Sequence, residues 1–156
     1  GLPDETADDI ENTIKKLIDI GANNITVHTL SVKRGSKLKQ EDPDYHLRGV
    51  QEVEVMLDNA SNILHAAGFV PYYVYRQKHQ MGSFENTGWC IPGLHSLYNI
   101  RIMEEMQTII GLGAGAIGKR YFPSENRLER IPNINDYRMY VERIDNIIAR
   151  KHKYFD

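Results

Sequence analysis

The first half of the sequence alternates between segments with a helical period of apolar residues and short segments of β-branched and aromatic residues. Helices are predicted over residues 6–21 and 47–68, and the first begins with the capping-box spacing at Thr6. Strands are predicted over 25–30 and 69–75. Alternation of this kind favours parallel strands joined by crossover helices, which means an open α/β sheet or part of a β/α barrel.

The second half of the sequence is less periodic. A polar connection is predicted over 32–43 and a loop over 76–93, because neither segment has an apolar period. A hairpin is predicted over 120–132, with its turn at 124–126. An amphipathic helix over 97–110 is expected to bury one face, which contains Leu97, Ile100, either Met103 or Ile102, Met106 and Ile110.

The last element is a predicted helix that Asn135 or Asp136 caps. Its spacing places four apolar side chains on one face, expected to point inward: Tyr137, Val141, Ile144 and Ile148.

Composition limits the class of protein. The chain has 156 residues, of which 41% are hydrophobic, and this is enough for one domain with a sizeable core. Its 19 basic and 21 acidic residues give a net charge of −2, so no nucleic-acid partner is expected. The longest apolar segments are too short to cross a bilayer and no leader is visible, so a cytoplasmic protein without a membrane partner is expected.

Few residues suggest catalysis or metal binding. Cys90 is the single cysteine, so it can form no internal disulfide and cannot hold an iron–sulfur cluster by itself. The six histidines lack zinc-site spacing, and no catalytic residue and no metal site are assigned. His28 lies near the end of a predicted strand, where barrel ligands are found, although such a histidine is more often part of the core or the rim.

The glycine-rich segment 111–118 matches two nucleotide-binding patterns. Gly113, Gly115 and Gly118 fit G-x-G-x-x-G, and residues 113–119 fit G-x-x-x-x-G-K. Both matches are interpreted as false, because a helical pattern precedes the glycines and Arg120 stands where a phosphate loop needs Ser or Thr. The glycines allow either close backbone packing or the approach of a bulky flat ligand.

Basic side chains follow both predicted strands. Arg34 and Lys37 lie in the loop after the first strand, and Arg76 and Lys78 begin the loop after the second. In a β/α barrel both loops would lie at the ligand-binding end. The four residues are either a solvated basic surface or a site for a polycarboxylate.

The order of the motifs resembles a known family. The motifs are Gly1-Leu2-Pro3 before a capped helix, the segment 21–27, Asn86-Thr87-Gly88-Trp89-Cys90-Ile91-Pro92-Gly93, Leu97-Tyr98-Asn99-Ile100, and Gly111-Leu112-Gly113-Ala114-Gly115-Ala116. Together they resemble the radical S-adenosylmethionine (SAM) enzymes of the oxygen-independent coproporphyrinogen III oxidase family. Segments 73–78 and 102–108 are most similar to the branch called coproporphyrinogen dehydrogenase HemZ-like.

This resemblance implies a fold and a reaction. The fold is α/β: residues 1–120 would form the second half of a (β/α)6 partial barrel, and 121–156 would begin a C-terminal tail with a hairpin and a helix. In the family, SAM is cleaved on a [4Fe–4S] cluster, and the resulting radical abstracts hydrogen from a propionate side chain. Coproporphyrinogen III thereby becomes protoporphyrinogen IX in haem biosynthesis.

The resemblance transfers few residues. The C-x-x-x-C-x-x-C cluster motif belongs to the first half of the barrel and is absent here, so neither cofactor site is expected to be complete in this chain. Ser31, Ile117, Gly113 and Gly115 are the positions expected near SAM, and the four basic residues above are those expected near the tetrapyrrole. The chain is therefore expected to be an inactive piece of an enzyme.

Two alternatives remain open at this point. One is a haem- or porphyrin-binding carrier of the same family without catalysis. The other is a folded half-barrel that dimerises to cover an exposed sheet edge.

Overall fold

A computed structural model describes all residues from 1 to 156, and the chain divides into two compact units, Gly1–Leu97 and Tyr98–Asp156. Each unit has its own sheet, of three and two strands respectively. The mixed helix and sheet content agrees with the predicted α/β class. The partial barrel and its boundary at residue 120 stay predictions.

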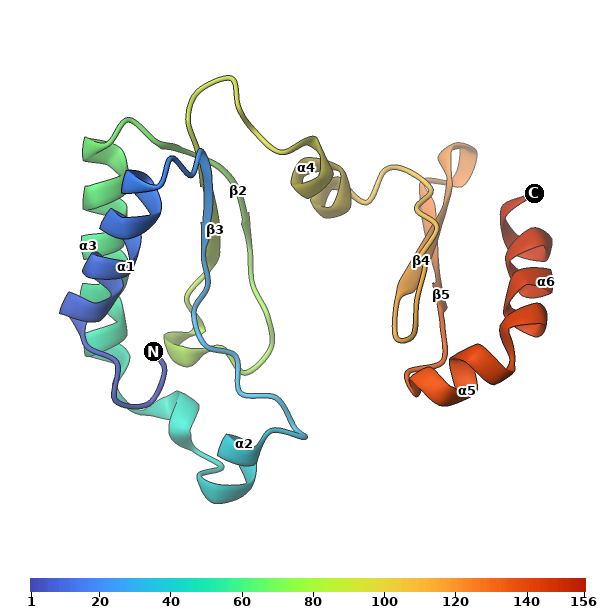
Figure 1. Ribbon diagram of the computed structural model, residues 1–156, viewed down its shortest axis with the longest axis horizontal. Coiled ribbons are helices and arrows are strands. Elements are labelled where there is room, and N and C mark those ends of the chain that lie inside the picture. The colour runs from blue at the N-terminus through green and yellow to red at the C-terminus, as the bar shows by residue number, and fades with distance from the viewer. The chain divides into compact units, whose positions relative to one another are not determined.

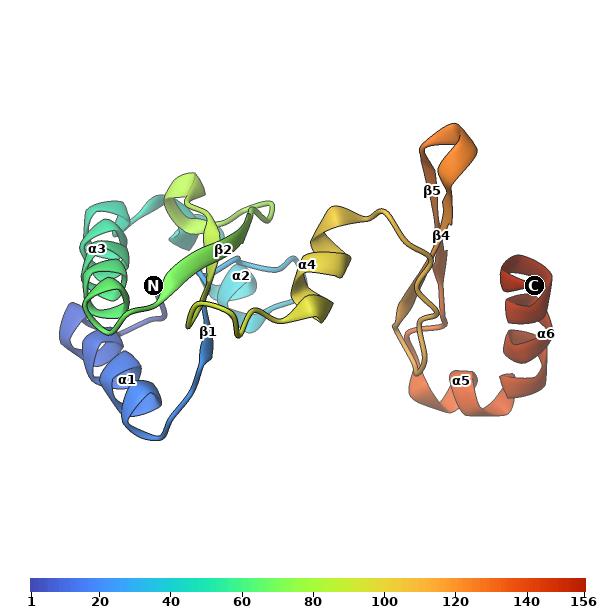
Figure 2. The ribbon, with the colours of Figure 1, turned by 90° about the horizontal axis from the view of Figure 1, so that it is seen from above.

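The first unit contains three strands and two long helices (Figure 1). The helices are α1 (Ala7–Asp19) and α3 (Val50–Ala66), and the strands are β1 (Asn24–Val27), β2 (Val70–Tyr75) and β3 (Asn86–Cys90). Both helices lie side by side on one face of the sheet, as the two perpendicular views show (Figure 2). The predicted helices and the two predicted strands are therefore present.

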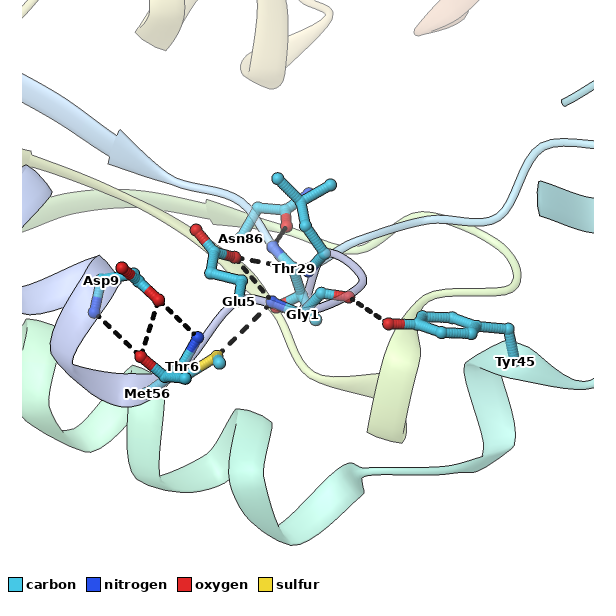
Figure 3. Close-up of polar contacts among 9 residues, drawn as sticks. Gly1, Glu5, Thr6, Asp9, Thr29, Tyr45, Met56 and Asn86 are labelled. Atoms are coloured by element: carbon cyan, nitrogen blue, oxygen red, sulfur yellow. Dashed lines mark hydrogen bonds and ion pairs between the residues drawn. The ribbon is translucent and has the colours of Figure 1, made fainter. Parts of the chain in front are cut away.

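The start of α1 is fixed locally. The Thr6 side chain accepts a hydrogen bond from the Asp9 backbone N–H, and the Asp9 carboxylate accepts from the Thr6 N–H at 2.9 Å and from the Thr6 hydroxyl at 2.7 Å (Figure 3). These hydrogen bonds lower the pKa of Asp9, because they favour its charged form. The predicted capping box is confirmed.

The expected parallel sheet was wrong, because β3 is the central strand. The strand order is β1-β3-β2, and β3 is antiparallel to both neighbours. The segment 76–93 was predicted as a loop, because it has no apolar period. Residues Asn86–Cys90 within it form β3, because Trp89 is only 6% exposed and packs into the core, while Gly88 leaves room for a neighbouring ring. The sheet and helices thus form a two-layer unit with β1 and β2 in the same direction on either side of β3.

The core of the first unit lies between the helices and the sheet. Its buried members are Ile14, Ile25, Ala60, Leu64, Phe69 and Trp89.

The predicted polar connection over 32–43 contains one regular element. Ser36 caps the short helix α2 (Lys37–Glu41), so the segment is not wholly irregular.

Tyr73 spans the open face of the sheet. Its hydroxyl lies 2.8 Å from Thr26 Oγ1 on β1, so the ring crosses the central strand at Gly88. A Cβ on Gly88 would lie 1.8 Å from Tyr73 Cε1. Burial raises the pKa of Tyr73 despite this hydrogen bond. The open face therefore carries a tyrosine that ties the outer strands together.

The second unit contains the predicted hairpin. Strands β4 (Ile117–Phe122) and β5 (Arg127–Pro132) pair antiparallel, and Asn126 at φ 45° completes the turn. Helix α4 (Leu97–Glu104) begins where the two units divide and is shorter than predicted. Its expected buried face is exposed, with Leu97, Met103, Met106 and Ile110 between 39% and 64% accessible.

The terminal helix is broken into two. Asp136 caps α5 (Tyr137–Glu142), as one of the two predicted caps, and α6 (Ile144–Phe155) begins after the break at Arg143. The break changes the buried face, so that Ile147 is 4% exposed whereas the predicted Tyr137 and Val141 are 64% and 66% exposed. The predicted inward face was wrong, because the expected single helical period does not continue across Arg143. No helix in the structure is long and apolar enough to span a membrane.

Candidate functional site

The ends of β1 and β2 lead into two segments that are hydrogen-bonded to each other. Ser31 forms an isolated antiparallel bridge with Gln80. The Val32 N–H donates to the His79 carbonyl at 3.1 Å, and the Met81 N–H donates to the Leu30 carbonyl at 3.0 Å. This pairing brings residues 28–33 next to residues 75–81, although β3 lies between β1 and β2 in the sheet.

Ser31 is held inside this junction. Its hydroxyl donates to the Lys78 carbonyl at 2.8 Å and accepts from Lys33 Nζ at 2.9 Å. The same Lys33 ammonium donates to Gln77 Oε1 at 2.5 Å. The predicted cofactor position Ser31 therefore lies in a hydrogen-bonded cluster and also lines a cavity.

A second chain of hydrogen bonds continues from Gln77. Gln77 Nε2 lies 3.5 Å from the Tyr75 hydroxyl, which in turn lies 3.1 Å from His28 Nδ1. The His28 and Tyr75 rings meet edge to face, with centroids 5.9 Å apart. Hydrogen bonds thus connect five side chains in one series: His28, Tyr75, Gln77, Lys33 and Ser31.

Buried polar residues beside the junction form hydrogen bonds with its backbone. The Thr29 N–H donates to Asn86 Oδ1 at 2.8 Å (Figure 3), and Gln80 Nε2 donates to the same Asn86 oxygen and to the Thr29 carbonyl. Thr29, Gln80 and Asn86 are each at most 5% exposed. The Thr29 hydroxyl has no hydrogen-bond partner. These interactions fix the backbone of the junction, since buried polar groups are costly unless they are paired.

A cavity of about 400 Å³ lies beside the junction. Its polar lining includes Glu5, His28, Ser31, Lys33 and Gln77. Its apolar lining comes from both helices and from the β1 region: Ile10, Val27, Leu30, Val53, Met56 and Leu57. The Glu5 carboxylate already accepts hydrogen bonds from the Gly1 ammonium (Figure 3) and from the Leu2 N–H, each at 3.3 Å. A cavity of this kind suits a small molecule with an apolar body and a polar end.

Arg76 and Lys78 line a second, more open cavity of about 560 Å³. His46 and His79 also line it, and their rings are 5.8 Å apart. Arg76 is paired with Glu85 at 3.3 Å, while Lys78 is exposed. The structure therefore brings together two of the four basic residues predicted to bind substrate.

The other two basic residues lie on the surface near α2. Arg34 is exposed, and Lys37 pairs with Glu41 at 3.4 Å with a side chain that is 86% exposed. Neither residue lines the two cavities described above. Their predicted role in substrate binding stays a prediction.

The glycine-rich segment lies in the second unit and its backbone groups are used internally. Gly111 Cα approaches β4 so closely that a Cβ would lie 2.7 Å from the Gly118 nitrogen. Asn133 Nδ2 donates to the Gly111 and Gly113 carbonyls at 3.2 and 2.8 Å, and Lys151 donates to the Gly111 carbonyl.

The three positions predicted near SAM in this segment have defined places. Gly113 and Gly115 have φ values of 93° and 72°, and Ile117 begins β4 with 51% exposure. The Gly113 N–H donates to the Tyr140 hydroxyl at 3.2 Å, and the Gly115 N–H donates to the Ile134 carbonyl at 2.9 Å. Close packing explains Gly111 and the positive φ values explain Gly113 and Gly115 without a ligand, and the role of Gly113, Gly115 and Ile117 near a cofactor stays a prediction.

Cys90 lies at the end of β3 and is 2% exposed. Burial raises the pKa of its thiol, which favours the unreactive protonated form. No three His, Cys, Asp or Glu side chains are grouped so that they could hold a metal ion. The residues of this chain therefore do not fit an iron–sulfur cluster.

Sequence reasoning missed most of the cluster at the strand ends. None of Lys33, Tyr75, Gln77, Gln80 and Asn86 was predicted as a site residue. Tyr73, Tyr75 and Gln77 alternate along one strand face, and this pattern could have indicated Tyr75 and Gln77. Gln80 and Asn86 meet only through the fold, so no local signal predicts them.

Comparison with curated proteins shows that the chain is related to the oxygen-independent coproporphyrinogen-III oxidase-like proteins. One such relative is HemZ of Bacillus subtilis (strain 168), which is 38% identical to this chain over 156 residues; the match covers the whole of this chain and 31% of HemZ. The family resemblance predicted from the motifs is thereby confirmed. No family model matches the chain, and no solved structure matches it.

Proposed function

We propose that this chain is part of a longer radical SAM oxidoreductase that oxidatively decarboxylates coproporphyrinogen III in haem biosynthesis. The observation that carries the proposal is the 38% identity to the HemZ protein across the entire chain, since that relative is named as coproporphyrinogen-III oxidase-like. The chain spans 31% of the relative, so the reaction is proposed for the longer protein. A cytoplasmic location is part of the same proposal.

The chain itself is proposed to be inactive. A [4Fe–4S] cluster needs several thiolates, and the single cysteine here is buried in β3. The cluster and SAM would therefore depend on residues outside this chain. What the chain would supply is part of the wall of a partial barrel, with Ser31 at one strand end in the first unit and Gly113, Gly115 and Ile117 in the second unit.

Arg76 and Lys78 are proposed to hold substrate carboxylates. They line one open cavity, and coproporphyrinogen carries propionate side chains that an Arg fork and a Lys ammonium would bind by charge-assisted hydrogen bonds. Arg76 would have to share its guanidinium with Glu85 or release it, because the two are paired at 3.3 Å. Lys78 is therefore the more available of the two cations.

The test uses the longer protein, reconstituted with cluster and SAM under anaerobic conditions. Conversion of coproporphyrinogen III to protoporphyrinogen IX is expected. Binding of haem or porphyrin without any conversion would contradict the proposed enzyme and would indicate a carrier of the same family.

A matched pair of variants tests the substrate cavity. Lys78→Ala is expected to raise the KM for coproporphyrinogen III by about tenfold, the effect of one lost charge-assisted hydrogen bond. Lys15→Ala removes another exposed lysine, one on α1 that lines neither cavity and has no predicted role in binding, and an equal effect of the two variants would contradict a special role of Lys78.

A further inference from the structure

Arg76 and Lys78 share the open cavity of about 560 Å³ with two histidines, His46 and His79. We propose that these histidines form a second carboxylate subsite, so that the cavity binds two carboxylates of one ligand, the first at Lys78 and the second at the two imidazoles. The inference rests on the proposed function for the role of Lys78, and it deepens that function by naming the residues that receive a further carboxylate.

The lining of this cavity contains positive charge and no acidic side chain. Its ionisable residues are Arg76, Lys78, His46 and His79. Glu85 pairs with Arg76 at 3.3 Å without lining the cavity, so Lys78 is the cation that is available to a ligand. An anion in the cavity is therefore attracted by the side chains that line it and repelled by none of them.

The backbone holds His79 at the cavity in a fixed conformation. His79 has a φ of 56°, in the left-handed region that residues other than glycine seldom adopt. Its carbonyl accepts from the Val32 N–H at 3.1 Å, and the Gln77 N–H donates to Gln80 Oε1 at 2.8 Å. Gln80 is only 4% exposed, so the turn is held from its buried side. Backbone that its surroundings hold in such a conformation is typical of binding sites, where it orients a side chain in advance.

His46 offers one particular ring nitrogen to a ligand. It lies in the 3-10 turn Tyr45–Leu47, and its Nδ1 is buried without a hydrogen-bond partner. A hydrogen on Nδ1 would be buried and unpaired, which is costly, so the ring hydrogen is assigned to Nε2. Because Nδ1 is inaccessible, Nε2 is the ring nitrogen of His46 that can reach a ligand in the cavity, and it is a donor.

The two imidazoles lie close enough to share one carboxylate. Their rings meet edge to face, with centroids 5.8 Å apart and planes at 88°. A carboxylate has two oxygens, so it can accept one hydrogen bond from each ring, and both bonds are charge-assisted. Lys78 directly precedes His79 in the chain, so a carboxylate at Lys78 and one at the imidazoles can belong to the same ligand. Leu47 and Val50 also line the cavity and would contact the hydrocarbon part of that ligand.

The test titrates the 156-residue chain by NMR with the unbranched dicarboxylates from butanedioate to octanedioate and with the monocarboxylates of the same chain lengths. At least one dicarboxylate is expected to bind about tenfold more tightly than its monocarboxylate, because it forms additional charge-assisted hydrogen bonds. It should also shift the ring signals of His46 and His79. Equal affinity of each dicarboxylate and its monocarboxylate would overturn the second subsite.

Variants separate a binding role from a structural one. His79→Ala should weaken dicarboxylate binding about tenfold and leave monocarboxylate binding unchanged, whereas Lys78→Ala should weaken both. His79→Gln keeps an N–H donor and should restore part of the preference for dicarboxylates. The matched control is His95→Ala, an exposed histidine that lines neither cavity, and it should change neither affinity. An equal loss for both kinds of ligand in His79→Ala would refute the subsite.

The result does not depend on turnover, because these probes contain no tetrapyrrole and undergo no reaction. A preference for dicarboxylates would support the subsite even if the longer protein left coproporphyrinogen III unchanged, and only the proposed reaction would then fail. Absence of the preference would refute the subsite even if the longer protein converted coproporphyrinogen III.

Discussion

Replacement of Gly88 by alanine tests how the central strand and the open face of the sheet are built. A Cβ at this position would lie 1.8, 2.3 and 2.6 Å from three ring carbons of Tyr73, closer than any real contact. The ring must move, and its hydrogen bond to Thr26 at 2.8 Å is then lost.

The expected cost follows from three contributions. Forced repacking costs about 1–3 kcal/mol, and the lost hydrogen bond costs about 1 kcal/mol. Replacing glycine by alanine within a strand returns about 0.5–1 kcal/mol of backbone entropy. The net loss in the free energy of unfolding is therefore about 2 kcal/mol.

Urea unfolding followed by the fluorescence of Trp89 measures this loss. Trp89 is the only tryptophan and is 6% exposed, so its signal reports the first unit. Gly35→Ala is the matched control, because nothing lies within 4 Å of a Cβ there, and it should change stability by less than about 0.5 kcal/mol.

A double-mutant cycle identifies the cause. In a Tyr73→Ala background the ring is absent, so Gly88→Ala should be neutral or slightly stabilising. The reasoning is refuted if Gly88→Ala is neutral in the unmodified chain, or if its cost is the same with and without the Tyr73 ring.

Three further changes have defined outcomes. Thr6→Ala should lower the free energy of unfolding of the first unit by about 1 kcal/mol through loss of the α1 cap, as measured by urea unfolding; an unchanged midpoint would contradict the capping role. The hydrogen bond from Lys119 lowers the pKa of Glu105 below its ordinary 4.5, so the stabilisation is present above that value and is lost as the pH falls through the lowered pKa. In Glu105→Gln, the stability of the second unit, followed by circular dichroism, should therefore fall less as the pH is lowered. An unchanged pH dependence would show that Glu105 does not cause the loss of stability in acid. Cys90 should react with a thiol reagent only after unfolding, since its thiol is buried and its pKa is raised; rapid labelling of the native chain would contradict its position in β3.

Elements that depend on residues close together in the chain were predictable from the sequence. The capping box at Thr6 and the hairpin turn at 124–126 depend on side chains a few residues apart, and both are present. Strand β3 was missed because its stability comes from distant partners. Trp89 enters a core built by other elements, and Gly88 is needed under the ring of Tyr73.

The candidate site shows the same limit. The strand-end positions of Ser31, Arg76 and Lys78 followed from the alternation of helices and strands, and each of these residues lines one of the two cavities. The link from Lys33 through Gln77 to Tyr75 joins segments more than 40 residues apart. Such a link depends on the pairing of Ser31 with Gln80, which no local pattern reveals.

The most direct test of the proposed family function compares the 156-residue chain with the longer protein that contains it, by cluster absorbance and by formation of 5′-deoxyadenosine from SAM. The longer protein is expected to hold the cluster and to form 5′-deoxyadenosine while coproporphyrinogen III is consumed, and the chain alone is expected to do neither. A cluster and SAM cleavage in the chain alone, or a cluster-loaded longer protein that leaves coproporphyrinogen III unchanged, would contradict the account.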